Sequence, residues 1–154
     1  MKKITKCIQY SSICHFSCCN HTDNSPFSLW MYPGEYENAS LEKNHIIVTG
    51  FQNGAVLGKC KCTSEQRRMC DGTAWFKPLD CWSYPFFPAI SEGKLVLRID
   101  VTRCPLANSC DLSEYYSQVY RAWQSVIRDK NAFRCIEQTN LIYFESCFSV
   151  IGKP

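Results

Sequence analysis

The chain has 154 residues, of which 12 are cysteines, and its formal net charge is +3. This length suits one domain with an ordinary core, and an aromatic content of 14% argues against disorder. The charge is mild and the basic residues are scattered, which argues against a nucleic-acid-binding protein.

The cysteine count dominates the prediction of compartment. An even number at this density indicates a disulfide framework formed in an oxidising environment, although spacing alone does not give the pairing. All twelve cysteines are candidates for bridges: Cys7, Cys14, Cys18, Cys19, Cys60, Cys62, Cys70, Cys81, Cys104, Cys110, Cys135 and Cys147.

Residues 1–44 are expected to form an irregular arm anchored by disulfides. Asn20 and Asn38 each begin an Asn-X-Ser/Thr sequon, the acceptor for N-glycosylation on the secretory route. The basic start at Met1–Lys6 is followed by a segment too polar for the core of a signal peptide. Nowhere is there an apolar run long enough to suggest a transmembrane helix. The route of export is therefore left open.

Residues 45–62 predict a β-hairpin. A β-rich run ends at Phe51, Asn53-Gly54 is a strong signal for a two-residue turn, and a second run follows from Ala55. Alternation along this second strand places Cys60 and Cys62 on the same face.

The segment 74–93 combines bulky aromatic residues with three prolines. The prolines argue against a central strand and favour an ordered aromatic loop, tethered at Cys81. Such side chains can fill a core or form a partner-binding surface. We predict a binding surface in which one or two of the last four of these residues are exposed: Trp75, Phe76, Trp82, Tyr84, Phe86 and Phe87.

Further along the chain, residues 94–102 alternate as a strand with one buried face. Apolar residues then recur at helical spacing over about 111–130, with Asp111 as a cap and Asn131 as a left-handed stop. Residues 133–137 and 141–151 are expected to be strands. The chain is therefore predicted to be α+β: a single disulfide-stapled domain over 1–154, with a mostly antiparallel sheet and one main amphipathic helix packed on it.

Metal binding is the alternative use of the cysteines. Thiolates and an imidazole crowd the N-terminal arm, and Cys60, Cys62 and Cys70 could complete a tetrahedral zinc site. Paired C-x-x-C knuckles are missing, so no metal and no cofactor are predicted. The alternative ligand set in the arm is Cys14, Cys18, Cys19 and His21.

The sequence holds no recognisable catalytic constellation. Its three histidines are His15, His21 and His45, and it contains neither a Gly-x-Ser-x-Gly elbow nor a glycine-rich phosphate loop. These features favour a non-enzymatic, disulfide-rich binding module or assembly subunit that contacts another protein, without nucleic acid or a transmembrane segment. One alternative is a reduced, zinc-stabilised adaptor or viral accessory module, and a second is a small secreted hydrolase or toxin.

The expected location is extracellular or in the lumen of the secretory pathway. The nine-residue gap between Cys60 and Cys70 is typical of mitochondrial twin CX9C proteins, although the second such segment is missing. The mitochondrial intermembrane space is therefore kept as the alternative.

Overall fold

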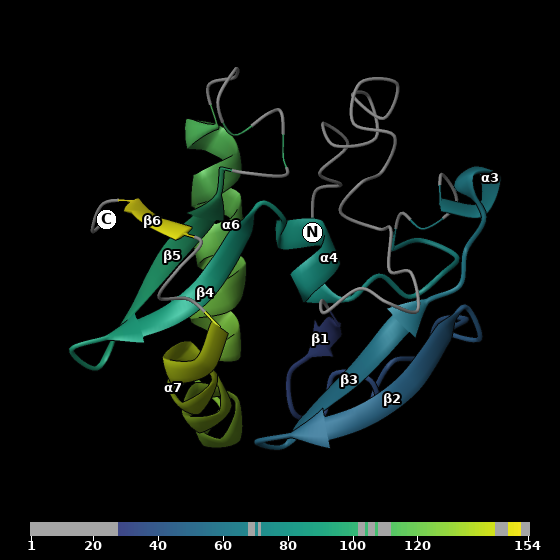
Figure 1. Ribbon diagram of the computed structural model, residues 1–154, viewed down its shortest axis with the longest axis horizontal. Helices are drawn as coiled ribbons and strands as arrows, with labels where there is room; N and C mark the ends of the chain where they lie inside the picture. Colours follow the sequence, from purple (N-terminus) through teal and green to yellow (C-terminus); the bar gives the residue numbers. More distant parts are fainter. Residues whose placement is uncertain are drawn as a thin grey trace. The chain divides into compact units, whose positions relative to one another are not determined.

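The protein is built of two compact units, the first ending at Trp82 and the second beginning at Ser83 (Figure 1). Each unit contains a three-stranded antiparallel sheet, so the predicted α+β class is confirmed. The single domain over 1–154 stays a prediction. The computed structural model describes residues 28–67, 70, 72–101, 104, 107, 112–143 and 148–151.

The first sheet has the strand order β1-β3-β2, with β1 at Leu29–Met31, β2 at Ile46–Gln52 and β3 at Ala55–Cys60. Asn53 and Gly54 join β2 to β3 with φ of 52° and 84°, the two left-handed positions that a type I′ turn requires. The predicted hairpin is confirmed. Strand β1 lies inside the segment predicted as an irregular arm, so that prediction is wrong for these residues.

The core of the first unit lies on one face of this sheet. Leu29, Met31, Ile46 and Val56 are buried together, and Tyr36, Phe76 and Cys81 pack against them. In the described part of this unit the helices are short: α3 at Ser64–Arg67 and α4 at Leu79–Ser83.

Two carboxyl side chains attach α4 to strand β1 and to the turn that follows β1. Glu35 accepts hydrogen bonds from the backbone nitrogens of Leu79 (2.6 Å) and Tyr32 (3.0 Å). Asp80 accepts one from the backbone nitrogen of Trp30 in β1 (3.1 Å). In this part of the unit, side-chain oxygens satisfy backbone donors that no neighbouring strand or helix reaches.

The second sheet has the strand order β4-β5-β6, with β4 at Phe86–Ser91, β5 at Lys94–Asp100 and β6 at Phe148–Ile151. Strand β4 falls in the segment predicted to be a loop, so that prediction is wrong for residues 86–91. Its proline, Pro88, is tolerated because β4 is an edge strand. Glu92 and Gly93 form the left-handed turn to β5, a turn that the sequence analysis did not recognise.

Strand β5 is buried on both faces, not on one as predicted. Leu95, Leu97 and Ile99 are buried on the expected face, but Val96 and Asp100 on the opposite face are buried as well. β5 is the central strand, with β4 and β6 on its two sides, and the burial of its side chains shows that both faces of the sheet are covered at this strand.

Two long helices pack in the second unit, α6 at Ser113–Val126 and α7 at Lys130–Tyr143. The predicted helix over about 111–130 corresponds to α6, and Tyr115, Val119 and Trp123 from its apolar stripe are buried. The strand predicted over 133–137 is wrong, because these residues lie within α7. The predicted cap Asp111 lies outside the described residues.

The sequence analysis did not predict that a second helix begins directly after the first. Asp129 is the cap of α7, since its Oδ1 accepts hydrogen bonds from the backbone nitrogens of Asn131 and Ala132, both at 2.9 Å. Asn131 therefore lies in the first turn of a new helix and is not a left-handed stop. Of the predicted strand over 141–151, residues 141–143 lie in α7 and residues 148–151 form β6, while residues 144–147 lie outside the described residues. None of the helices among the described residues is long and apolar enough to cross a membrane.

Candidate functional site

The predicted aromatic binding loop is not one structural element. Its residues belong to both units, including α4 and β4. None of the six side chains is exposed: Tyr84 and Phe86 are buried, and Trp75, Phe76, Trp82 and Phe87 are partly buried.

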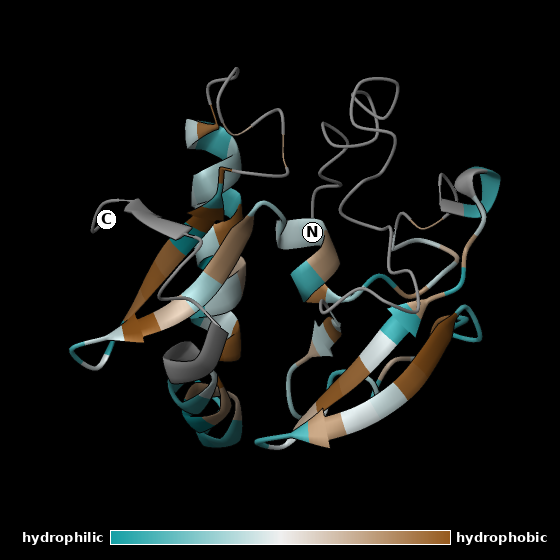
Figure 2. Ribbon diagram, in the orientation of Figure 1, coloured by the Kyte–Doolittle hydropathy of each residue, from teal (hydrophilic) through white to brown (hydrophobic). Residues whose placement is uncertain are grey.

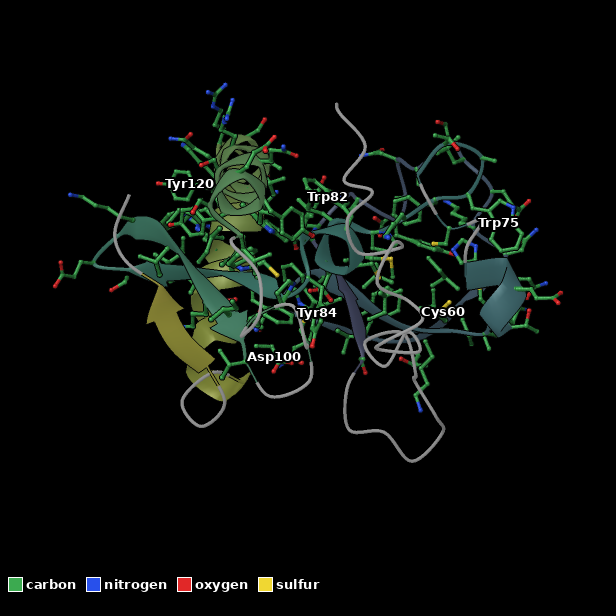
Figure 3. All side chains as sticks on the ribbon, turned by 90° about the horizontal axis from the view of Figure 1, so that it is seen from above. Cys60, Trp75, Trp82, Tyr84, Asp100 and Tyr120 are labelled. Atoms are coloured by element: carbon green, nitrogen blue, oxygen red, sulfur yellow. The ribbon has the colours of Figure 1, made fainter. Side chains whose placement is uncertain are left out.

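In the second unit these aromatic residues fill the core. The Tyr84 hydroxyl donates to Asp100 Oδ2 at 2.8 Å, and the two side chains lie close together in Figure 3. The Tyr115 hydroxyl of α6 donates to the Tyr84 carbonyl at 2.9 Å, and the Phe86 and Tyr115 rings are 5.6 Å apart. The predicted exposure is therefore wrong for Tyr84 and Phe86, because α6 covers them.

The disulfide prediction is addressed only in part by the described residues. No disulfide joins two of Cys60, Cys62, Cys70, Cys81, Cys104 and Cys135. The other six cysteines lie outside the described residues: Cys7, Cys14, Cys18, Cys19, Cys110 and Cys147. The alternative zinc ligands Cys14, Cys18, Cys19 and His21 lie outside them as well.

The two sequons have different outcomes. Asn20 lies outside the described residues, whereas the Asn38 side chain is exposed at the end of a turn that spans residues 33–38. Its backbone nitrogen donates to the Gly34 carbonyl at 3.0 Å. Asn38 thus has the exposure that a glycan requires, and its modification stays a prediction.

One histidine lies in a buried cluster of the first unit. His45 is 7% exposed, and its ring stacks on Trp75 with 5.0 Å between ring centroids. Its Nε2 lies 3.9 Å from Cys70 Sγ. Figure 3 labels Trp75 and Cys60 in this unit. A backbone hydrogen bond of 2.8 Å from Phe76 N to the Glu42 carbonyl holds the two segments together.

Burial lowers the pKa of His45, and the Phe76 backbone and the Glu42 carboxylate oppose this shift in part. The imidazole is therefore neutral near pH 7. Nevertheless, the described residues contain no group of three or more side chains placed to hold a metal ion. Cys60, Cys62 and Cys70 are therefore not gathered as three ligands among the described residues, and the arm residues that would complete a zinc site lie outside them.

Another surface of the first unit has the character of a contact site. Among the residues whose side chains the structure describes, which leaves out 140–143 and 148–151, three large apolar side chains are exposed. All three lie on β2: Ile47 (49%), Val48 (37%) and Phe51 (74%). We call them the β2 edge surface. In Figure 2 the first half of β2 is coloured as hydrophobic.

The exposure follows from the position of β2 in the sheet. Strand β2 is an edge strand, and among the described residues it pairs only with β3. Val48 lies opposite Gly58, which has no side chain to cover it. A Cβ at Gly58 would come within 2.9 Å of the Ile47 carbonyl oxygen, so a larger residue does not fit there without movement.

The sequence analysis missed this surface, although a signal was present. Ile46, Ile47 and Val48 are three consecutive apolar residues in a strand. Successive side chains point to opposite faces, so such a run cannot be buried unless both faces are covered. Ile46 reaches the core and Ile47 does not.

Comparison with known proteins finds no matching protein family, no matching curated protein and no matching solved structure.

Proposed function

We propose that the protein is a non-enzymatic binding module or assembly subunit, and that it contacts another protein chain through the β2 edge surface. One observation carries this proposal. All three of the exposed large apolar side chains in the described residues lie on one edge strand. Exposed apolar residues that gather in one place mark interaction sites more often than scattered ones do.

Strand addition is the binding mode that suits this surface. Ile47 pairs with Lys59 and Val48 with Gly58, so their side chains point to opposite faces of the sheet. A partner lying on one face would cover only part of the surface. A partner strand added beside β2 places its own side chains next to those of β2 on both faces and hydrogen-bonds to the backbone of the edge.

Site-specific photocrosslinking in cells that express the chain tests the proposal. A benzophenone amino acid replaces Phe51, and the control carries it at Glu65, an exposed position of α3 in the same unit. We expect a discrete protein adduct from position 51 and none from position 65. Equal adducts from both positions, or no adduct from position 51, would contradict the proposal.

The disulfide framework belongs to the same proposal, together with an extracellular or secretory-lumen location. It is supported by the twelve cysteines and by the exposed sequon at Asn38. Denatured, non-reduced protein should show few titratable thiols and no bound zinc. Ten or more titratable thiols among the twelve cysteines would contradict the disulfide framework.

A further inference from the structure

The backbone pairing shows which groups of β2 point away from the sheet. The nitrogen of Trp30 donates to Asp80, so Trp30 directs its backbone groups away from β3. Leu57, which is paired with Trp30, therefore directs its backbone N–H and C=O toward β2. The residues on either side of it, Val56 and Gly58, direct their N–H and C=O toward β1.

The consequence for β2 follows from the same alternation. Val48 is paired with Gly58 and Phe51 with Val56, and both of these partners use their backbone groups toward β1. Val48 and Phe51 therefore direct their N–H and C=O groups outward, away from β3. The two outward positions with the exposed side chains are also the positions where a further strand would hydrogen-bond.

The spacing of these positions is irregular. In a regular antiparallel strand, outward positions alternate, with one residue between them. In β2 the register shifts between Val48 and Gly50, so both Thr49 and Gly50 lie between Val48 and Phe51. The bulge also places both side chains on the same face, since each is paired with a residue of the Val56–Gly58 face.

A regular partner strand has one residue between its hydrogen-bonding positions, so it cannot pair with both Val48 and Phe51. An antiparallel copy of β2 has the same two-residue spacing and can pair with both. We propose that the β2 edge surface binds β2 of a second copy of this chain, about a two-fold axis between Thr49 and Gly50. Val48 of each copy then faces the partner copy's Phe51. The inference rests on the proposed function and names the partner.

Charge is compatible with this arrangement. The residues of β2 carry no charge, so no like charges meet along the strand. The charged residues Glu42, Lys43 and Lys61 all lie near the start of β2, while the uncharged Asn53-Gly54 turn lies at its end. Antiparallel pairing places the charged end of one copy beside the uncharged turn of the other, whereas parallel pairing would bring the lysines of the two copies together.

Sedimentation velocity on the full chain tests the pairing, at about 1 to 100 µM protein, the range of a micromolar dissociation constant. We expect a dimer that weakens by at least about tenfold in Phe51→Lys and in the double variant Val48→Lys/Phe51→Lys. Phe51→Lys is the variant least able to disturb folding, because this side chain is 74% exposed.

A charge swap tests the register. In Val48→Lys/Phe51→Glu, each introduced lysine faces an introduced glutamate across the axis, so this variant should dimerise better than Val48→Lys/Phe51→Lys. The exposed control Glu65→Lys should behave as the wild type. A wild-type monomer across the whole range, or equal association of the two double variants, would overturn the inference. A monomer that still gives an adduct with a different protein from position 51 would overturn the inference and leave the proposed function standing.

Discussion

The two three-stranded sheets differ in what covers them. The second sheet has the two long helices α6 and α7 in its unit, and its central strand is buried on both faces. Among the described residues of its unit, the first sheet is accompanied by helices of four and five residues. The carboxyl side chains of Glu35 and Asp80 accept hydrogen bonds from backbone nitrogens and so attach α4 to β1 and to the turn after it. Three large apolar side chains on the edge strand β2 are exposed to water.

This difference suggests separate roles: the helix-covered second sheet provides a stable core, and the exposed edge of the first sheet provides the candidate binding surface. In the second unit the apolar stripe of α6 packs toward the sheet. Tyr84, Phe86, Tyr115 and Trp123 are buried there. Among the described residues, the core lies on one face of the first sheet and β2 pairs only with β3. Three large apolar side chains of β2 stay exposed, and a partner could bury them. The aromatic residues predicted to form a binding surface are therefore buried or partly buried, and the exposed apolar side chains of β2 provide another candidate site.

The largest effect is expected from a cavity in the helix-covered unit. Trp123 of α6 is fully buried, so Trp123→Ala should destabilise the second unit by about 3–5 kcal/mol. Chemical denaturation followed by circular dichroism measures the loss. The exposed neighbour Gln124→Ala is the matched control. Similar stability of the two variants would mean that α6 does not hold this unit together.

The carboxylate attachment predicts a pH dependence of the first unit. Burial raises the pKa of Glu35 from its ordinary 4.5 to about 8, against its two backbone hydrogen bonds. Between these values the folded state binds more protons than the unfolded state, so the free energy of unfolding should fall as pH rises from about 4.5 to about 8. Thermal unfolding measured across this range should show the fall.

Glu35→Gln should flatten that dependence, because the amide does not ionise. The exposed Glu37→Gln serves as control and should keep the slope of the wild type. If Glu35→Gln and the wild type show the same slope, the buried carboxyl is not its source.

A smaller effect is expected at the start of α7. Asp129→Ala removes the oxygen that accepts two backbone hydrogen bonds and should cost about 1 kcal/mol. Asp129→Asn keeps an acceptor and should cost less. The urea midpoints of the three proteins measure the difference, and an alanine variant as stable as the wild type would show that the cap is dispensable.

The smallest effect on folding is expected at the β2 edge surface. Phe51→Lys should change the stability of the monomer by no more than about 0.5 kcal/mol, since the side chain is mostly in water already. Val56→Ala, which truncates a buried side chain in the same hairpin, should cost clearly more. A large loss in Phe51→Lys would show that Phe51 supports the fold and would remove it from the candidate site.

Local signals in the sequence predicted part of this structure. Asn53-Gly54 identified the hairpin because its two left-handed positions have few other causes, and the apolar stripe of α6 identified the first helix. The strand at Phe86–Ser91 was missed because prolines exclude a central strand but allow an edge, and edge or centre is decided by tertiary pairing. Asn131 was predicted to end a helix because the sequence does not show that Asp129 caps a new helix just before it. This role of Asp129 appears only in the folded geometry.

The site was harder to predict than the fold. The exposure of Ile47 depends on which segments cover the first sheet, and no local pattern contains that information. The two-residue spacing between the outward positions Val48 and Phe51 depends on the bulge between Val48 and Gly50, which appears only when the register is known.

The hydrogen bond from Trp30 N to Asp80 has a consequence for the size of the assembly. It occupies an outward backbone donor of β1, the strand at the other edge of the same sheet. A sheet that accepted new strands at both edges would polymerise into a filament, as unprotected edges do. Because Asp80 occupies this donor, the proposed pairing through β2 should stop at a closed pair. Asp80→Ala removes the acceptor, and we expect it to favour further association at the β1 edge.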